Sequence, residues 1–258
     1  MTRFVKVERS EKNSAIQIIT IDRPPRNAMS QETYEQLLSA FKESQTDESI
    51  LCIILTGAGE KSFVAGGDLN EHSQLTAENA QKRTDLIRKV FSTIREHRVP
   101  VIAAVNGYAL GGGLALMASC DIVVASRTAK FSLPEVKVGI MGGTSHLRRL
   151  VPDKVVRMMA LTGEFVDANY FRSLGAVQAV VEPEELMTEA KRIAQSICEH
   201  SPNCVKLMKE TMNLTEYMAL DDGYHVECFA TSIIKGTPEA QEAVRAVIEK
   251  RKPNFKPN

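Results

Sequence analysis

The chain lacks an excess of either charge, and it lacks any long apolar run. Its 258 residues include 32 Lys and Arg against 32 Asp and Glu, so no net positive charge attracts phosphate backbones, and we expect no nucleic-acid partner. No segment approaches the roughly 20 apolar residues of a membrane span, and the charged N-terminal residues do not form a signal sequence. The sequence therefore predicts a cytoplasmic protein without a membrane partner.

Paired metal ligands and paired cysteines are also missing. The five cysteines are odd in number and contain no Cys-x-x-Cys spacing, and no two histidines stand at metal-ligand spacing. We therefore expect free thiols and no metal site. A hydrophobic content of 43% over 258 residues is enough for a substantial core.

The pattern of apolar residues predicts an α/β fold. β-rich runs alternate with segments of helical periodicity in the first part of the chain, and helices alone follow from about residue 182. We expect a sheet-bearing core over residues 1–198 and a helical C-terminal region over residues 199–258. The predicted strands cover residues 15–21, 50–56, 101–105, 121–125 and 178–181. The predicted helices cover residues 31–45, 77–96, 114–119, 154–161, 183–200, 202–214, 220–234 and 238–250.

Three consecutive glycines, Gly111 to Gly113, follow the predicted strand over residues 101–105 and precede a helix of small residues. Glycine tolerates unusual backbone angles and close ligand approach, and a helix start presents unpaired N–H groups with the positive end of its dipole. Such a junction can stabilise a substrate oxygen that becomes negatively charged during a reaction. A close contact between helix and sheet is the structural alternative for these glycines.

Other glycine-rich motifs do not explain the chain. The segment over residues 57–62 has no glycine directly before its Lys-Ser pair, as a phosphate loop requires, and we interpret it as a turn. Neither that segment nor the glycine triplet completes the G-x-G-x-x-G dinucleotide pattern, and a G-x-S-x-G nucleophile elbow is absent. Oxyanion binding therefore remains the functional interpretation of the glycine triplet.

Two further segments can complete a reaction site with the triplet. The turn at Gly66 and Gly67 follows the predicted strand over residues 50–56, so two similar turns can donate to one oxygen. Glu135 follows Pro134 in an otherwise apolar segment, and apolar surroundings raise the pKa of a carboxyl toward the range of an acid–base group. A first-turn helix residue favoured by the dipole is the alternative for Glu135.

Six short sequence blocks are distributed over essentially the whole chain. They are DRPPRNA at residues 22–28, FVAGGDL at 63–69, AAVNGYALGGG at 103–113, CDI at 120–122, SLPEVKVG at 132–139 and EKRKPNF at 249–255. In this order, the blocks resemble those of the enoyl-CoA hydratase/isomerase family, also called the crotonase family. The resemblance implies a spiral of ββα units with a helical C-terminal trimerisation region, in a homo-oligomer that is a trimer or a dimer of trimers. It also implies an acyl-CoA thioester substrate and no dissociable cofactor, because the CoA arrives on the substrate.

The resemblance also implies the catalytic groups. In this family, the backbone N–H groups at the positions of Gly67 and Gly112 bind the thioester oxygen as it becomes an enolate, and Glu135 matches one of the two carboxylates of the hydratases. The other carboxylate is missing, because Ala115 stands where the hydratases carry glutamate. His146 follows a glycine turn that lies beside the reacting carbons in the family, so it is a candidate for the missing function. A polar histidine at a helix start is the alternative.

Binding roles follow from the same resemblance. The turn that starts at Ala65 corresponds to a CoA-binding segment in which Leu69 packs against the adenine. Lys250 corresponds to a cation that a neighbouring subunit offers to the CoA phosphates, with a solvated helix end as the alternative. Asp68 and Glu71 stand where the family commonly has acidic residues that do not carry the proton, and we interpret them as structural.

We favour hydration of a 2-enoyl-CoA to a 3-hydroxyacyl-CoA. Isomerisation from Δ3 to Δ2 remains open, because a single carboxylate can move a proton between the α and γ carbons. Hydrolysis or decarboxylation also remains open, since the same oxyanion site serves those reactions. A non-catalytic RNA-binding or scaffolding protein is a different class of hypothesis, which the retained Gly67, Gly112 and Glu135 disfavour.

Overall fold

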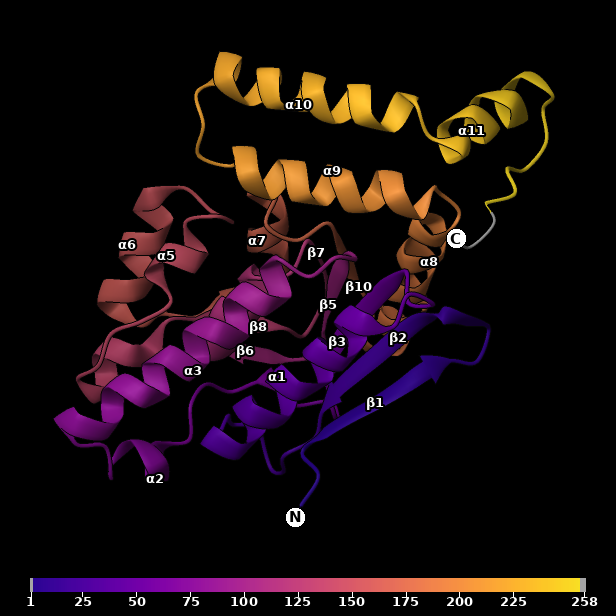
Figure 1. Ribbon diagram of the computed structural model, residues 1–258. Helices are drawn as coiled ribbons and strands as arrows, with labels where there is room; N and C mark the ends of the chain where they lie inside the picture. Colours follow the sequence, from indigo (N-terminus) through magenta and orange to yellow (C-terminus); the bar gives the residue numbers. More distant parts are fainter. Residues whose placement is uncertain (1, 256–258) are drawn as a thin grey trace.

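The computed structural model describes residues 2–255 and contains two β-sheets with helices packed around them (Figure 1). In the larger sheet β1 and β2 are antiparallel, whereas β2, β3, β5, β7 and β10 run parallel. The predicted α/β class is confirmed. In spatial order, the larger sheet consists of β1 (Val5–Ser10), β2 (Asn13–Ile21), β3 (Cys52–Gly57), β5 (Val101–Val105), β7 (Ile122–Ser126) and β10 (Ala179–Val181). The smaller sheet consists of β4 (Ser62–Val64), β6 (Tyr108–Leu110), β8 (Lys130–Ser132) and β9 (Val166–Asp167).

A β-β-helix unit repeats along the chain and connects the two sheets. Each of β3, β5 and β7 leads through a short turn into β4, β6 or β8, and a helical segment then follows. β4, β6 and β8 pair in parallel, so their carboxyl ends meet at one edge of the smaller sheet. The segments that carry Gly67, Gly112 and Glu135 follow these strands directly, and the topology therefore brings them to the same edge.

Caps determine where several helices begin. Ser30 accepts a hydrogen bond from the Thr33 amide at the start of α1 (Gln31–Thr46), and Thr76 begins α3 (Ala77–Arg95) with a capping box. α4 (Gly112–Ala118) starts at Gly112 rather than at the predicted residue 114, because Gly111 turns the chain with a φ of 52°. The remaining helices before the C-terminal region are α2 (Leu69–His72), α5 (Thr144–Leu147), α6 (Asp153–Thr162), α7 (Ala168–Ser173) and α8 (Leu186–Cys198).

One predicted helix is divided in the structure, and several strands were missed. The helix predicted over residues 183–200 is divided, because Pro183–Glu185 forms a separate 3-10 turn (η2) and α8 begins only at Leu186. β1 and the short strands β4, β6, β8 and β9 were not predicted. Another 3-10 turn, η1 (Pro134–Val138), follows β8.

The larger sheet is buried on both faces. On one face, Ile53, Leu55 and Val101 belong to a core cluster that includes Leu37 and Phe41 of α1. On the other face, a second cluster joins the sheet to α8 through the side chains of Ile18, Ile54, Ile102, Leu186 and Ala190. Burial on both sides explains why the central parallel strands are continuous apolar runs in the sequence.

The C-terminal region consists of α9 (Pro202–Thr215), α10 (Leu220–Lys235) and α11 (Pro238–Ile248). Figure 1 shows α9 and α10 side by side, with α11 beyond the end of the pair. Lys209 anchors α9 to the core, since its buried ammonium donates to Asp121 Oδ2 at 2.7 Å and to the Val99 carbonyl at 3.1 Å. Within residues 2–255, no helix is long and apolar enough to cross a membrane.

Candidate active site

Two backbone N–H groups lie at the carboxyl ends of neighbouring strands. Gly67 follows β4 and Gly112 follows β6, and neither amide donates a hydrogen bond to an acceptor in the described part of the chain. The Gly67 turn is held on both sides, because Met29 N donates to Gly66 O at 2.8 Å and Asp68 N donates to Met29 O at 3.0 Å. The geometry therefore leaves two fixed donors for an oxygen of a bound molecule.

Both glycines line one cavity of about 590 Å³, which we call the reaction cavity. Its lining also includes Ala115, Glu135 and His146. The structure thus brings together the four residues that the sequence predicts as catalytic, together with Ala115. Their catalytic roles stay predictions.

The carboxyl of Glu135 has an unusual environment. Glu135 lies in the first turn of η1, after Pro134, and its Oε2 is buried without a hydrogen-bond partner among the described residues. Burial raises the pKa of the Glu135 carboxyl above its ordinary value. Buried polar atoms without partners are rare in proteins. An unpaired carboxyl with a raised pKa at the wall of a cavity is suited to exchange protons with a bound molecule.

Ala115 and His146 also line the reaction cavity. Ala115 lies one helical turn after Gly112 on α4 and is 2% exposed. His146 lies in α5, and its ring stands edge-on to Phe91 with 4.9 Å between the ring centroids. Burial lowers the pKa of His146, and the nearby Arg149 and Arg95 lower it further. The imidazole is therefore neutral at pH 7 and can donate or accept one proton.

Tyr34 is a residue of this site that the sequence reasoning missed. It lies on α1, is 2% exposed, and lines the reaction cavity. Its hydroxyl lies 3.0 Å from the point where a Cβ on Gly112 would stand, and burial raises the pKa of Tyr34 to about 12. The hydroxyl therefore stays protonated and is a further donor beside Gly112. The apolar spacing of α1 gave no signal that separates Tyr34 from an ordinary core aromatic.

Two ion pairs support the turn at Gly67. The Arg23 guanidinium binds the Asp68 carboxylate, which also caps α2 by accepting from Asn70 N at 2.8 Å. The Arg83 guanidinium binds Glu71 and donates to the Met29 carbonyl. Both acidic residues are thus committed to contacts that hold the turn, as their structural interpretation predicts.

The residues predicted to bind CoA lie outside the reaction cavity. Ala65 follows β4, and its amide donates to Arg26 O at 3.3 Å. Leu69 begins α2 and is 60% exposed, so its side chain is accessible to a planar ring of a bound molecule. Lys250 follows α11 with a φ of 53° and is also exposed. These three assignments stay predictions.

The family comparison agrees with this geometry. The family model for enoyl-CoA hydratase/isomerase matches residues 11–258. The chain is 40% identical over 246 residues to the short-chain-enoyl-CoA hydratase of Clostridium acetobutylicum, with 94% of each chain covered. It is 37% identical over 249 residues to the crotonyl-CoA hydratase of Syntrophomonas wolfei, covering 95% of this chain and 96% of that one.

Solved structures give the same result. The crystal structure of an enoyl-CoA hydratase from Bacillus anthracis superposes with a TM-score of 0.94 at 30% identity, over 98% of this chain and 99% of that one. Fold and sequence therefore define the class as a crotonase-type α/β protein. The chain belongs to the enoyl-CoA hydratase/isomerase family.

Proposed function

We propose that the protein hydrates a 2-enoyl-CoA to a 3-hydroxyacyl-CoA. The observation that carries the proposal is the unpaired carboxyl of Glu135, which lines the same cavity as the free amides of Gly67 and Gly112. The names of the two bacterial relatives, a short-chain-enoyl-CoA hydratase and a crotonyl-CoA hydratase, support it.

The chemistry follows from these groups. The thioester oxygen accepts hydrogen bonds from Gly67 and Gly112, which stabilise the negative charge that develops there. Glu135 takes a proton from water as the water oxygen bonds to C3, and the double-bond electrons move toward the thioester oxygen to form an enolate. The carbonyl re-forms when C2 accepts a proton. Glu135 can return the proton that it took, because it is the sole carboxylate in the described lining of the cavity.

Isomerisation from a 3-enoyl-CoA to a 2-enoyl-CoA is the second candidate, favoured by one observation. Ala115 leaves Glu135 as the sole carboxylate of that described lining. One carboxyl can remove a proton from C2 and deliver it to C4 through the same enolate.

To decide between hydration and the other reactions, the protein is incubated with 2-enoyl-, 3-enoyl- and malonyl-type CoA thioesters. The enoyl absorbance and the release of free thiol are then measured. We expect the fastest turnover with a 2-enoyl-CoA, and Glu135→Gln should lower its kcat by at least ~10²-fold. Glu184→Gln is the matched control, because Glu184 also follows a proline in a 3-10 turn but is exposed. If no thioester reacts and the protein binds RNA at moderate salt, the enzymatic proposal is wrong.

The protein also has a surface suited to self-association, and we propose a homotrimer or a dimer of trimers. Large apolar side chains are exposed on the C-terminal helices, which supports a buried interface in the assembly. These side chains are Met208, Met212, Leu214, Leu220, Tyr224, Phe229, Ile233, Val244, Val247 and Ile248. In such an assembly Lys250 of a neighbouring copy would meet the CoA phosphates, while Ala65 and Leu69 would hold the adenine. Light scattering on the purified protein measures the size of the oligomer, and a monomer at micromolar concentration would contradict the proposed assembly.

The cytoplasmic location and the absence of a dissociable cofactor stay predictions.

A further inference from the structure

The lining of the reaction cavity is rich in guanidinium groups. Within the described residues it contains four arginines, namely Arg83, Arg88, Arg95 and Arg149, and a single carboxylate, Glu135. The acidic partners of these arginines, which are Glu71, Asp85, Glu96 and Glu216, are not part of the lining. Each of these ion pairs therefore places its cationic member, and not its anionic member, at the wall of the cavity.

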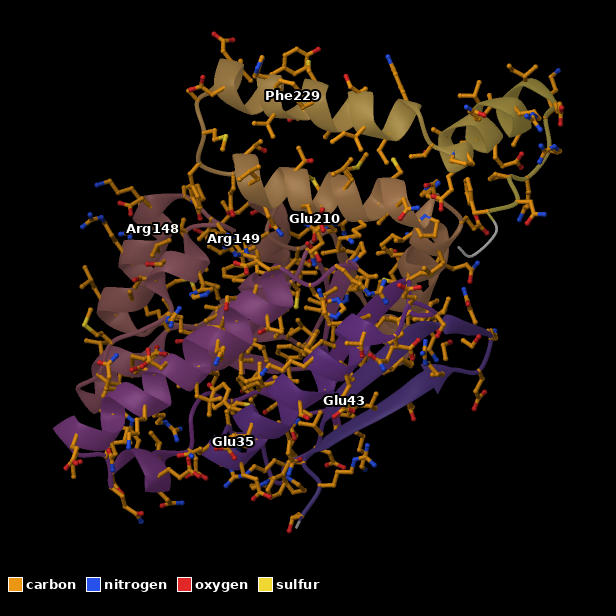
Figure 2. The ribbon with its side chains drawn as sticks, in the orientation of Figure 1. Glu35, Glu43, Arg148, Arg149, Glu210 and Phe229 are labelled. Carbon is orange, nitrogen blue, oxygen red and sulfur yellow. The ribbon has the colours of Figure 1, made fainter. Side chains whose placement is uncertain are left out.

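Two of these arginines stand at the end of the cavity away from Gly112. Arg149 Nη1 donates to the carbonyl of Ala118 at 2.7 Å, at the C-terminal end of α4. Because α4 begins at Gly112, six residues of 1.5 Å rise separate the two positions by ~9 Å along the helix. Ala115 lies between them, and Figure 2 shows Arg149 in the region between α5 and α9.

Arg95 and Arg149 share one acidic partner. Glu216, at the end of α9, accepts from Arg149 Nε at 2.6 Å and from Arg95 Nη1 at 3.4 Å. Arg95 also contacts the largely exposed Glu96, which water screens. Arg149 Nη2 and Arg95 Nε donate no hydrogen bond to any described residue. Guanidinium donors thus remain available at this end of the cavity.

A position ~9 Å along α4 from the oxyanion-donor amide matches an acyl chain rather than the CoA phosphates. The phosphates are separated from the thioester by the whole pantetheine arm, so they lie farther from Gly112 than Arg149 does. The acyl chain extends from the thioester past C2 and C3, which Glu135 must reach, and a chain that runs along α4 would bring its distal end to the arginines. A neutral alkyl tail would offer no acceptor to Arg149 Nη2 or Arg95 Nε, whereas a carboxylate would.

We propose that the acyl chain of the substrate carries a second anionic group, a carboxylate at its distal end, which binds to Arg95 and Arg149. This inference rests on the proposed acyl-CoA function and names the class of substrate within it. Guanidinium–carboxylate hydrogen bonds are charge-assisted and directional, so they select this group over a methyl end.

The test compares pairs of trans-2-enoyl-CoA thioesters with four to six acyl carbons, in which the members of a pair differ in a terminal methyl or a terminal carboxylate. We expect kcat/KM to be about tenfold to a hundredfold higher for the carboxylate at the matching length. Arg95→Gln should bring this ratio toward one, and Arg95→Lys should restore part of it. Arg192→Gln, at an exposed arginine of α8 paired with Glu189, should leave the ratio unchanged. A preference for the methyl end, or a ratio that Arg95→Gln does not alter, overturns the inference.

A binding measurement separates this inference from the proposed function. Titration calorimetry with the saturated thioesters of the same pairs requires no turnover, and the carboxylate member should bind at least about tenfold more tightly. Tighter binding without turnover of any enoyl-CoA would refute the proposed reaction and support the anionic substrate class. Equal binding of the two saturated thioesters, with hydration of the methyl-ended substrate intact, would refute the anionic substrate class alone.

Discussion

The carboxyl of Glu135 lies directly against Gly111, the residue that turns the chain into α4. A Cβ at position 111 would overlap Glu135 Oε1 and stand 3.0 Å from the carboxyl carbon. Gly111 is therefore required for two reasons, its positive φ and the space that it leaves for the proposed proton carrier. The next residue, Gly112, supplies a proposed oxyanion donor, so one turn positions both parts of the chemistry.

Gly111→Ala should lower kcat by at least ~10²-fold, because the new methyl displaces the Glu135 carboxyl from the position of a general acid–base group. Steady-state kinetics on a 2-enoyl-CoA measures the effect. Gly175→Ala is the matched control, since Gly175 also has a positive φ of 79° but an added Cβ meets nothing within 4 Å. Both variants should lose about 1–2 kcal/mol of stability from the backbone strain. Equal kinetics in the two variants would show that the contact with Glu135 is irrelevant to turnover.

Glu135→Gln should stabilise the protein while it inactivates the enzyme. Burial raises the pKa of Glu135 in the folded state, so the folded protein holds this proton at pH values where the unfolded chain has released it. The wild type therefore loses stability relative to the variant as the pH rises from the unfolded pKa through the folded one. Thermal unfolding of both proteins should give a larger difference in Tm at about pH 8 than at about pH 4. A difference that grows toward low pH would have the wrong sign for a desolvated carboxyl.

Much of the fold could be predicted from local signals, whereas the smaller sheet could not. The helices over residues 31–45 and 77–96 were predicted to within one residue, because caps and apolar periodicity define them locally. β4, β6 and β8 have three residues each, too few to show a strand period. They form because neighbouring β-β-helix units pair with one another. Their parallel pairing is what brings the Gly67, Gly112 and Glu135 segments to one edge.

The residues of the site divide in the same way. Some are indicated by the local sequence, whereas others are brought together only by contacts between distant parts of the chain. Gly67, Gly112 and Glu135 could be proposed because each lies in a recognisable block. The shared contact of Arg95 and Arg149 with Glu216 joins residues separated by 121 and 67 positions, and nothing local indicates it. Tyr34 was missed for a different reason, since the residue is part of the core as well as of the cavity lining.

Tyr34→Phe tests whether the tyrosine hydroxyl contributes to the reaction. Tyr34 lines the reaction cavity, and its hydroxyl lies 3.0 Å from the Cβ position of Gly112, so the removal of the hydroxyl should leave Tm nearly unchanged. We expect kcat to fall about tenfold or more while KM changes little, because a donor beside Gly112 acts chiefly on the charge that develops in the transition state. Tyr170→Phe, at an exposed tyrosine of α7, is the control. An unchanged kcat would assign Tyr34 to packing alone.

Ala115→Glu should raise hydration relative to isomerisation. The new carboxyl would start one helical turn after Gly112 and enter the reaction cavity, where Glu135 is the sole carboxylate of the described lining. Water addition benefits from a second group that holds the water, whereas proton transfer between C2 and C4 needs only one. We expect the ratio of the two kcat/KM values to rise several-fold, roughly as far as one added acid–base group allows. Ser173→Glu is the control, because Ser173 lies on α7, is exposed and is not part of the lining of the reaction cavity.

The outcome for Ala115→Glu also decides the role of His146. The imidazole is neutral at pH 7, because burial and the adjacent arginines lower its pKa, and it can hold the water that the missing glutamate would hold. If His146 performs this task, His146→Phe should lower hydration more than isomerisation, and Ala115→Glu should restore the loss in the double variant. If the double variant recovers nothing, and the ratio in Ala115→Glu alone equals that of the wild type, the water is held elsewhere. Glu135 then acts alone on both proton positions, and isomerisation becomes the better description of the natural reaction.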